Sequence, residues 1–212
     1  MSTVAIVGAG YVGVPLARVF ADAGHSVLLV DVQADRVAQL NRGESYIEDV
    51  PSAVLKKHVD AGLITATTDY DELKGADAIL VALPTPLSDQ REPDLTILLA
   101  ATEEVAPRLQ RGQLVVLEST TYPGTTRERI RPLLEAGGLE AGVDFHLAFS
   151  PERVDPGRED WTTKTTPKVV GGLTDECTRR AVELYGSAVD KVVEVSSPEA
   201  AELTKLLENI FR

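Results

Sequence analysis

Short runs of apolar residues alternate along the chain with longer stretches whose apolar residues recur at helical spacing. Such alternation is typical of a parallel sheet covered by helices on both faces. Strands are predicted near Val4 to Val7, Val27 to Val30, Leu63 to Ala66, Ala78 to Leu83, Gln113 to Glu118, His146 to Phe149, Lys168 to Gly171 and Lys191 to Val195. Helices are predicted at Val12 to Ala23, Ala34 to Asn41, Ser52 to Ala61, Leu95 to Leu109, Thr126 to Ala136 and Asp175 to Gly186. The pattern therefore predicts an α/β fold with a doubly wound, mostly parallel sheet.

The C-terminal segment is predicted to begin a further helix. Ser197 suits an N-cap, Pro198 suits the first helical position, and apolar residues then recur at helical spacing. The chain ends at Phe211-Arg212, with no Gly, Asn or Pro after this apolar stripe. We therefore expect residues 1–196 to form one domain and residues 197–212 to start a central helix that is cut within a longer protein. A frayed natural terminus is the alternative.

Composition and charge narrow the possible partners. The 212 residues are 43% hydrophobic and 25% charged, which is ordinary for a globular protein. A net charge of −12 repels phosphate backbones and anionic lipids, so we expect neither a nucleic-acid nor a membrane partner. Cys177 is the single cysteine and no apolar run reaches membrane-spanning length, which favours the cytoplasm. The three histidines lack metal-ligand spacing, so no metal site is expected.

A glycine-rich turn joins the first predicted strand to the first predicted helix. Gly8 permits a tight turn, Gly10 lets a pyrophosphate approach the backbone, and Gly13 allows the helix to pack on the strand. Tyr11 and Val12 open the helix, where free N–H groups and the positive end of the helix dipole attract phosphate. The turn therefore predicts a dinucleotide-binding, Rossmann-like domain. The alternative is a glycine turn that serves only a tight strand-to-helix connection.

A carboxylate follows the second predicted strand at the position that binds an adenosine ribose in such domains. Asp31 can accept hydrogen bonds from both ribose hydroxyls and would repel a 2′-phosphate, which favours NAD over NADP. Arg36 lies nearby and could accommodate a 2′-phosphate, so NADP is the less favoured alternative.

Hydroxyl and charged side chains follow three further strands at the same edge of the predicted sheet. They lie in Pro84-Thr85-Pro86, in Glu118 to Thr125, and in Ser150-Pro151-Glu152-Arg153. Doubly wound folds bind their ligands at this edge. Thr85 could equally belong to a capped turn between two prolines, and Ser and Thr often cap helices as in Glu118 to Thr125.

Two polar residues of the last helix, Lys205 and Asn209, share one face. A surface pair at this spacing is the more common explanation when the residues are considered alone. The least regular stretch, Glu152 to Thr166, is rich in Pro, Gly, Thr and charge and is interpreted as a loop over a site.

Taken in order, these motifs resemble the nucleotide-sugar 6-dehydrogenases related to UDP-glucose dehydrogenase, and the resemblance covers essentially the whole chain. It comprises the glycine turn, Asp31 with Arg36, Pro84-Thr85-Pro86, Glu118-Ser119-Thr120, Ser150 to Arg153 with Pro156-Gly157, Pro167 to Gly172, and Lys205 to Asn209. UDP-glucose enzymes usually carry Asn-Pro-Glu-Phe where this chain has Ser-Pro-Glu-Arg. The chain thus looks more like the UDP-N-acetylhexosamine 6-dehydrogenases, which serve surface-polysaccharide synthesis.

The resemblance implies oxidation of the sugar C6 alcohol to a carboxylate with two molecules of NAD and a cysteine thioester. It implies that Thr120 and Glu152 flank the reacting C6, that Lys205 stabilises the developing oxyanion, and that Asn209 holds the hydrogen-bond geometry. It implies a UDP-sugar contacted by Glu152, Arg153, Lys205 and Asn209. The cofactor-binding residues it implies are Gly8, Gly10, Tyr11, Val12, Gly13, Asp31, Arg36, Thr85 and Thr120. In this family the central helix commonly builds a homodimer.

The chain departs from the family pattern in one respect. The nucleophilic cysteine of the family lies beyond the central helix, together with the domain that grips UDP. Cys177 lies in a different part of the pattern and is interpreted as a bystander. We therefore expect the chain alone to bind NAD without completing the oxidation. The alternatives are a UDP-glucose 6-dehydrogenase, a non-catalytic dinucleotide-binding module, or another NAD-linked dehydrogenase such as a hydroxyacid type.

Overall fold

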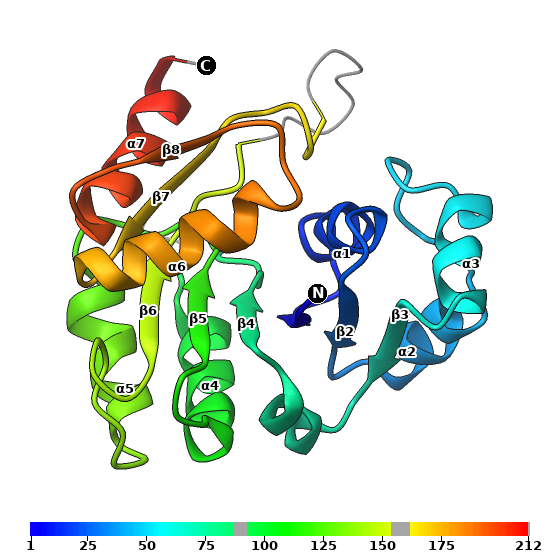
Figure 1. The fold of residues 1–212 in the computed structure, drawn as a ribbon, viewed down its shortest axis with the longest axis horizontal. Helices are drawn as coiled ribbons and strands as arrows, with labels where there is room; N and C mark the ends of the chain where they lie inside the picture. The colour runs from blue at the N-terminus through cyan, green and yellow to red at the C-terminus, as the bar shows by residue number, and fades with distance from the viewer. Residues whose placement is uncertain (87–92, 154–161, 212) are drawn as a thin grey trace.

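An eight-stranded sheet runs through the structure, a computed structural model that describes residues 1–86, 93–153 and 162–211 (Figure 1). The strands are β1 (Thr3–Val7), β2 (Ser26–Val30), β3 (Ile64–Thr67), β4 (Ala78–Val81), β5 (Leu114–Leu117), β6 (His146–Phe149), β7 (Lys168–Gly172) and β8 (Val192–Glu194). Their order is β3-β2-β1-β4-β5-β6-β7-β8. Only the β6–β7 pair of this sheet is antiparallel. The predicted Rossmann-like, doubly wound and mostly parallel sheet is confirmed.

Helices connect the strands and cover both faces of the sheet. The α-helices are α1 (Gly13–Asp22), α2 (Ala34–Asn41), α3 (Ser52–Asp60), α4 (Thr96–Val105), α5 (Arg131–Glu135), α6 (Asp175–Gly186) and α7 (Pro198–Phe211). Two short 3₁₀ helices, η1 (Tyr70–Gly75) and η2 (Ala106–Arg108), and a π-helix, η3 (Thr125–Ile130), complete the described elements. As predicted, α7 begins at Pro198, and the Ser197 hydroxyl oxygen accepts the Ala200 N–H at 3.2 Å.

Two apolar cores lie on opposite faces of the sheet because strand side chains alternate between them. Along β1, Val4 and Ile6 pack in one core with residues of α1, α3 and α6, whereas Ala5 and Val7 pack in the other with residues of α4 and α5. In Figure 1, α6 crosses in front of the strands and α4 lies behind them. The residues of β1 from Val4 to Val7 are fully buried, because helices cover both faces of the sheet.

The structure corrects two predicted helices and reveals an element that the pattern did not predict. The helix predicted at Leu95 to Leu109 ends at Val105 and continues as η2, where Pro107 lacks the N–H for a further helical bond. The helix predicted at Thr126 to Ala136 begins as the π-helix η3 and becomes α-helical only at Arg131. The 3₁₀ helix η1 was not predicted, because its residues show no apolar periodicity. Its N-cap is Asp69, whose carboxylate accepts the Asp71 N–H.

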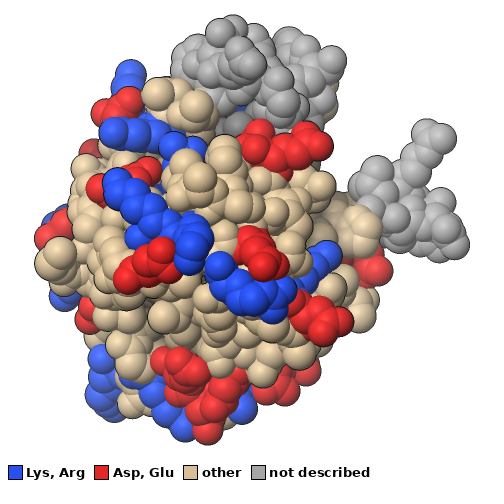
Figure 2. Space-filling view, turned by 90° about the vertical axis from the view of Figure 1, so that its right-hand side faces the viewer, with Lys and Arg blue, Asp and Glu red and all other residues tan. Residues whose placement is uncertain are grey.

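Acidic and basic side chains are mixed on the surface. Figure 2 shows acidic and basic side chains interspersed over the face that carries α2 and α3. In the described part of the chain, no helix combines the length and the apolar character needed to cross a bilayer.

Candidate functional site

Three glycines of the turn after β1 have different roles in the structure. Gly8 has a φ of +103°, and a Cβ there would lie 2.5 Å from the carbonyl oxygen of Ala82. A Cβ on Gly13 would overlap the carbonyl oxygen of Gly8, so α1 packs on the turn only without a side chain. At Gly10 a Cβ would meet nothing within 4 Å. The fold therefore requires Gly8 and Gly13, whereas Gly10 leaves open space beside the start of α1.

The N-terminus of α1 faces this space without a side-chain cap. Val12 is the N-cap residue and its side chain makes no capping hydrogen bond. Tyr11 is largely exposed beside it. An α-helix of this length has unpaired N–H groups in its first turn and a positive dipole end, both of which suit a pyrophosphate. The turn and the start of α1 thus leave open space beside an uncapped helix N-terminus.

Asp31 lies where the sequence analysis expected it and is held rigidly. It follows β2, and its two carboxylate oxygens accept the N–H groups of Ala9 and Gln33, each at 2.9 Å. Each oxygen retains a second lone pair, so the carboxylate can also accept the two ribose hydroxyls. The link to Ala9 joins the glycine turn to the end of β2.

Tyr46 supports this end of the site, and no motif of the sequence pointed to it. Its hydroxyl donates to the carbonyl oxygen of Ala9 at 2.5 Å, and its ring lies 5.4 Å from the guanidinium of Arg36. Burial, and then the charge of Asp31, raise the pKa of Tyr46 to about 12. Arg36 is thus stacked on Tyr46, and the predicted ribose end of the site is braced by a residue far along the chain.

The loops after β4 and β5 are hydrogen-bonded to each other. The Thr85 hydroxyl donates to the carbonyl oxygen of Thr120 at 2.6 Å, and the Ser119 hydroxyl oxygen accepts the Leu83 N–H at 3.0 Å. Thr85 therefore ties two loops together and is more than a turn between two prolines. The structure brings the Thr85 side chain and the Thr120 backbone into direct contact.

A buried ionic cluster lies at the same edge, beyond β5 and β6. The Lys168 ammonium lies 2.5 Å from Glu118 Oε2 and 3.4 Å from Glu152 Oε2, and the Tyr185 hydroxyl donates to Glu118 Oε1. Burial raises the pKa of Glu118 and that of Tyr185. Burial alone would lower the pKa of Lys168, but the carboxylates of Glu118 and Glu152 raise it. The sequence analysis placed Glu118 in a polar segment at this edge and named Glu152 as a site residue, but it gave Lys168 and Tyr185 no role.

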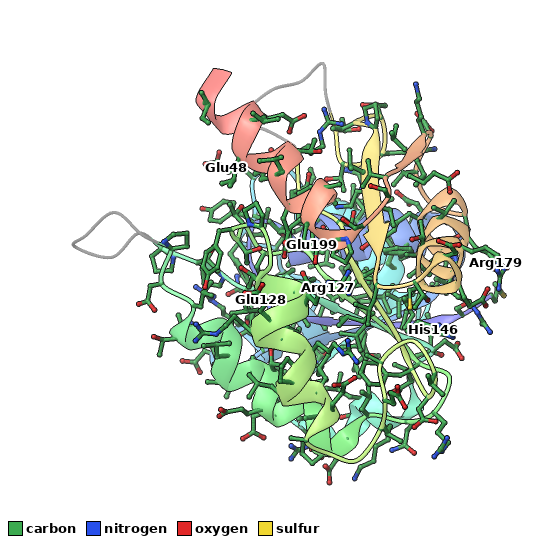
Figure 3. The ribbon with its side chains drawn as sticks, turned by 90° about the vertical axis from the view of Figure 1, so that its left-hand side faces the viewer. Glu48, Arg127, Glu128, His146, Arg179 and Glu199 are labelled. Atoms are coloured by element: carbon green, nitrogen blue, oxygen red, sulfur yellow. The ribbon has the colours of Figure 1, made fainter. Side chains whose placement is uncertain are left out.

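Helix α7 is bound to the π-helix η3 through a buried carboxylate. Glu202 is fully buried and accepts the N–H of Gly124 at 2.7 Å and both the N–H and the hydroxyl of Thr126 at 2.9 and 2.7 Å. Burial outweighs these hydrogen bonds and raises the pKa of Glu202. An ion pair of 2.6 Å between Arg127 and Glu199, both labelled in Figure 3, adds a second link.

These links determine where the predicted residues of α7 lie. Lys205 is buried, less than one turn beyond Glu202 on the same helix. Arg153, next to Glu152, forms an ion pair with Glu208 of α7. The side chain of Asn209 lies outside the described residues, as do Pro156 and Gly157. The structure therefore brings the segment after β6 and helix α7 together.

The remaining chemical candidates are placed away from this edge. Cys177 is fully buried, its sulfur accepts the Leu147 N–H at 3.4 Å, and it lies 3.8 Å from Nδ1 of His146. Burial lowers the pKa of His146. Such packing supports the interpretation of Cys177 as a bystander. Over the described ranges, no group of three or more His, Cys, Asp or Glu residues is arranged to hold a metal ion.

Comparison with known proteins shows to which family the chain belongs. Residues 2–189 match the model of the "UDP-glucose/GDP-mannose dehydrogenase family, NAD binding domain". The chain belongs to this family. It is an NAD-binding domain of nucleotide-sugar dehydrogenases, and NAD is its cofactor. The resemblance stated from the motifs is thereby confirmed.

Relatives within the family agree along the whole chain. The chain is 36% identical over 210 residues to the UDP-N-acetyl-D-mannosamine dehydrogenase of Pyrococcus horikoshii and 38% identical over 221 residues to that of Escherichia coli K12. These alignments cover 99% and 100% of the chain but 50% and 51% of the relatives. The crystal structure of an NDP-N-acetyl-D-galactosaminuronic acid dehydrogenase from Methanosarcina mazei superposes with a TM-score of 0.92 at 37% identity, covering 100% of this chain and 47% of that one. The chain thus spans about half the length of the curated relatives it matches.

Proposed function

We propose that this NAD-binding domain serves an enzyme that oxidises the C6 alcohol of a UDP-N-acetylhexosamine to a carboxylate, with two molecules of NAD per sugar. The names of the relatives support a UDP-N-acetylhexosamine as substrate. The observation that carries the proposal is the meeting of the glycine turn, the loops after β4, β5 and β6, and helix α7 at one edge of the sheet. In this division, residues 1–196 hold NAD and residues 197–212 bring α7 to the reacting carbon.

The fit of NAD to this chain rests on the open space at Gly10 and the carboxylate of Asp31. Gly8, Gly10 and Gly13, with the first residues of α1, would hold the pyrophosphate by backbone N–H groups. Asp31 would hold the adenosine ribose beside Arg36. When bound, NAD supplies the acceptor for a hydride from C6. Thr85 and Thr120, already joined to each other, would lie against its nicotinamide end.

The substrate side is assigned to charged residues that approach from β6 and α7. Glu152 would accept the proton that leaves the C6 hydroxyl, with Thr120 orienting the reacting group. Lys205 would stabilise negative charge on the C6 oxygen, and Asn209 would fix its hydrogen-bond geometry. Arg153 would contact the substrate while its guanidinium is held by Glu208. These roles assign proton transfer and charge stabilisation to residues of two different segments.

A panel of UDP-sugars, followed by NADH absorbance in the full-length protein that carries these residues, tests the proposal. We expect UDP-N-acetylhexosamines to yield two NADH per sugar. Glu152→Gln should lower the rate by about 100-fold or more, as expected for a lost general base. Glu103→Gln, at an exposed position of α4, is the matched control and should leave the rate unchanged. Preferred turnover of UDP-glucose would reassign the substrate, and no turnover of any UDP-sugar would contradict the proposal.

The chain of 212 residues alone is expected to bind NAD without forming the acid. Its single cysteine, Cys177, is buried in the core, so it offers no accessible thiol for a thioester. That free cysteine also fits a cytoplasmic protein. Isothermal titration should show NAD binding by this chain, and an assay with a UDP-sugar should show no steady acid formation. Steady acid formation by the chain itself would refute this expectation.

We also propose that the full-length protein is a homodimer built around α7. Leu203, Leu207 and Ile210 of this helix are exposed large apolar residues, 47%, 47% and 76% accessible. A contiguous apolar face of this kind favours association. Sedimentation equilibrium should give twice the mass of one chain. Leu203→Glu with Leu207→Glu should give the mass of one chain, and an unchanged mass would exclude this interface.

A further inference from the structure

The buried cluster of Lys168, Glu118 and Tyr185 is not needed for any step assigned above. Lys168 is 3% exposed, Glu118 is 2% exposed and Tyr185 is fully buried. A buried lysine is costly unless it is paired, and an ion pair of this kind often adds little to stability compared with apolar residues. The position of the cluster, one contact away from Glu152, suggests another reason for its presence.

The fold brings a cation to this edge by reversing one strand. Glu118 follows β5 and Glu152 follows β6, so both lie at the carboxyl edge of the sheet. Lys168 is the first residue of β7, and β7 runs antiparallel to β6. The beginning of β7 therefore lies beside the end of β6. A parallel strand in this place would carry its first residue at the opposite edge.

The ammonium of Lys168 is shared unequally between two carboxylates. Its contact with Glu118 Oε2 is 2.5 Å, and Tyr185 donates to the other oxygen of Glu118, so this carboxylate is fixed on both sides. A second, longer contact of Lys168 reaches Glu152 Oε2 at 3.4 Å, and the ammonium also lies 5.3 Å from the centre of the Tyr185 ring. Glu152 Oε1 accepts the N–H of Arg153 at 2.7 Å. A purely structural pair would need only Glu118, whereas here the lysine also reaches the carboxylate of the proposed site.

We propose that Lys168 is a positioning residue for Glu152: held in place by Glu118 and Tyr185, its ammonium orients the Glu152 carboxylate and keeps it ionised, ready to accept a proton. The inference rests on the proposed function, which assigns Glu152 as the proton acceptor. Among the residues that the structure describes, the charged and titratable groups near Glu152 include Lys168 of β7, Glu118 after β5, Tyr185 of α6 and the neighbouring Arg153, which is itself paired with Glu208 of α7.

Titration of Glu152 by NMR tests this role without substrate or turnover. Glutamate is labelled with ¹³C at the carboxyl carbon in the 212-residue chain, and Glu152→Gln identifies the resonance of Glu152. Lys168→Met should move the titration midpoint of Glu152 to higher pH by on the order of one unit, because a nearby positive charge is lost. Lys168→Arg keeps the charge and should leave the midpoint near that of the unsubstituted chain. Glu118→Gln removes a negative neighbour and should move the midpoint to lower pH.

The titration midpoint of Glu152 should thus rise in Lys168→Met and fall in Glu118→Gln. If Lys168 and Glu118 had only a structural role, the direction of the shift would not follow the charge that is removed. An unchanged midpoint in folded Lys168→Met would overturn the proposal, as would a rise in Glu118→Gln. If Lys168→Met does not fold, the double variant with Glu118→Gln leaves no unpaired buried charge, and its midpoint must exceed that of Glu118→Gln alone; equality overturns the proposal. Failure of the proposed function would appear separately, as full turnover in Glu152→Gln with the midpoint shifts intact.

Discussion

Gly10→Ala separates the needs of the fold from those of the cofactor. A Cβ at Gly10 meets no atom within 4 Å, and the φ of Gly10 lies outside the left-handed range that disfavours alanine. The folded chain can therefore accept the methyl group without strain. Alanine also restricts the unfolded chain, so we expect the free energy of unfolding to stay level or rise by about 0.4–1 kcal/mol.

The same methyl group occupies the space proposed for the pyrophosphate. To avoid it, the phosphates must move away from the N-terminus of α1 and lose at least one hydrogen bond from the backbone. A hydrogen bond to a charged group contributes about 1.5–3 kcal/mol. The loss of one such bond should raise the Kd for NAD by about 10- to 150-fold, since 1.4 kcal/mol corresponds to a factor of ten.

Isothermal titration of NAD and urea unfolding measure the two effects on the same sample. Gly75→Ala is the matched control, because a Cβ at Gly75 also meets nothing within 4 Å and its φ is likewise outside the left-handed range. We expect it to match Gly10→Ala in stability and to bind NAD normally. Gly13→Ala should instead be destabilised, because its Cβ would overlap Gly8. Unchanged NAD affinity in Gly10→Ala would refute the proposed pyrophosphate site.

Three further predictions concern residues that brace the site. Asp31→Asn should weaken NAD binding by about 10-fold or more and reduce the preference for NAD over NADP. Calorimetry with both cofactors measures the two effects, and an NAD affinity equal to that of the unsubstituted chain would argue against the ribose contact. Glu202→Ala leaves three buried donors without their acceptor and should lower the free energy of unfolding by about 3 kcal/mol. Urea unfolding measures this loss, and a change below about 1 kcal/mol would contradict the anchoring role. The pKa of Tyr46 is raised from 10.0 to about 12 in the folded chain, so the folded state retains this proton at higher pH and the free energy of unfolding should fall as pH rises from 10.0 towards 12. Tyr46→Phe should remove that part of the fall, which chemical unfolding at several pH values can detect.

The sequence was sufficient for features that depend on neighbouring residues. The strands are apolar because both faces of the sheet are covered, and the turn from Gly8 to Gly13 carries its geometry in three glycines. The start of α7 at Pro198 was likewise visible as a local cap. Helix boundaries were less predictable where Pro107 and the π-helix η3 change the hydrogen-bond period without ending the apolar pattern.

Features that depend on long-range contacts could not be predicted in the same way. Tyr46 contacts Ala9 across 37 positions, Lys168 contacts Glu118 across 50, and Glu202 contacts Thr126 across 76. Nothing in the local sequence distinguishes such residues from exposed ones of the same type. Their roles follow only from the topology, which brings the ends of distant strands to one edge.

These long-range contacts also explain how an acidic chain can hold an anionic cofactor. Three carboxylates at or near the binding edge, those of Asp31, Glu118 and Glu202, are each bound by specific donors within the protein. Each therefore joins two segments, and hydrogen bonds or an ammonium offset part of its charge. The pyrophosphate is assigned to neutral backbone N–H groups, which the net charge of −12 does not describe. The backbone N–H groups at the glycine turn and the ammonium at the start of the reversed strand β7 thus determine which anionic groups can lie at the carboxyl edge of the sheet.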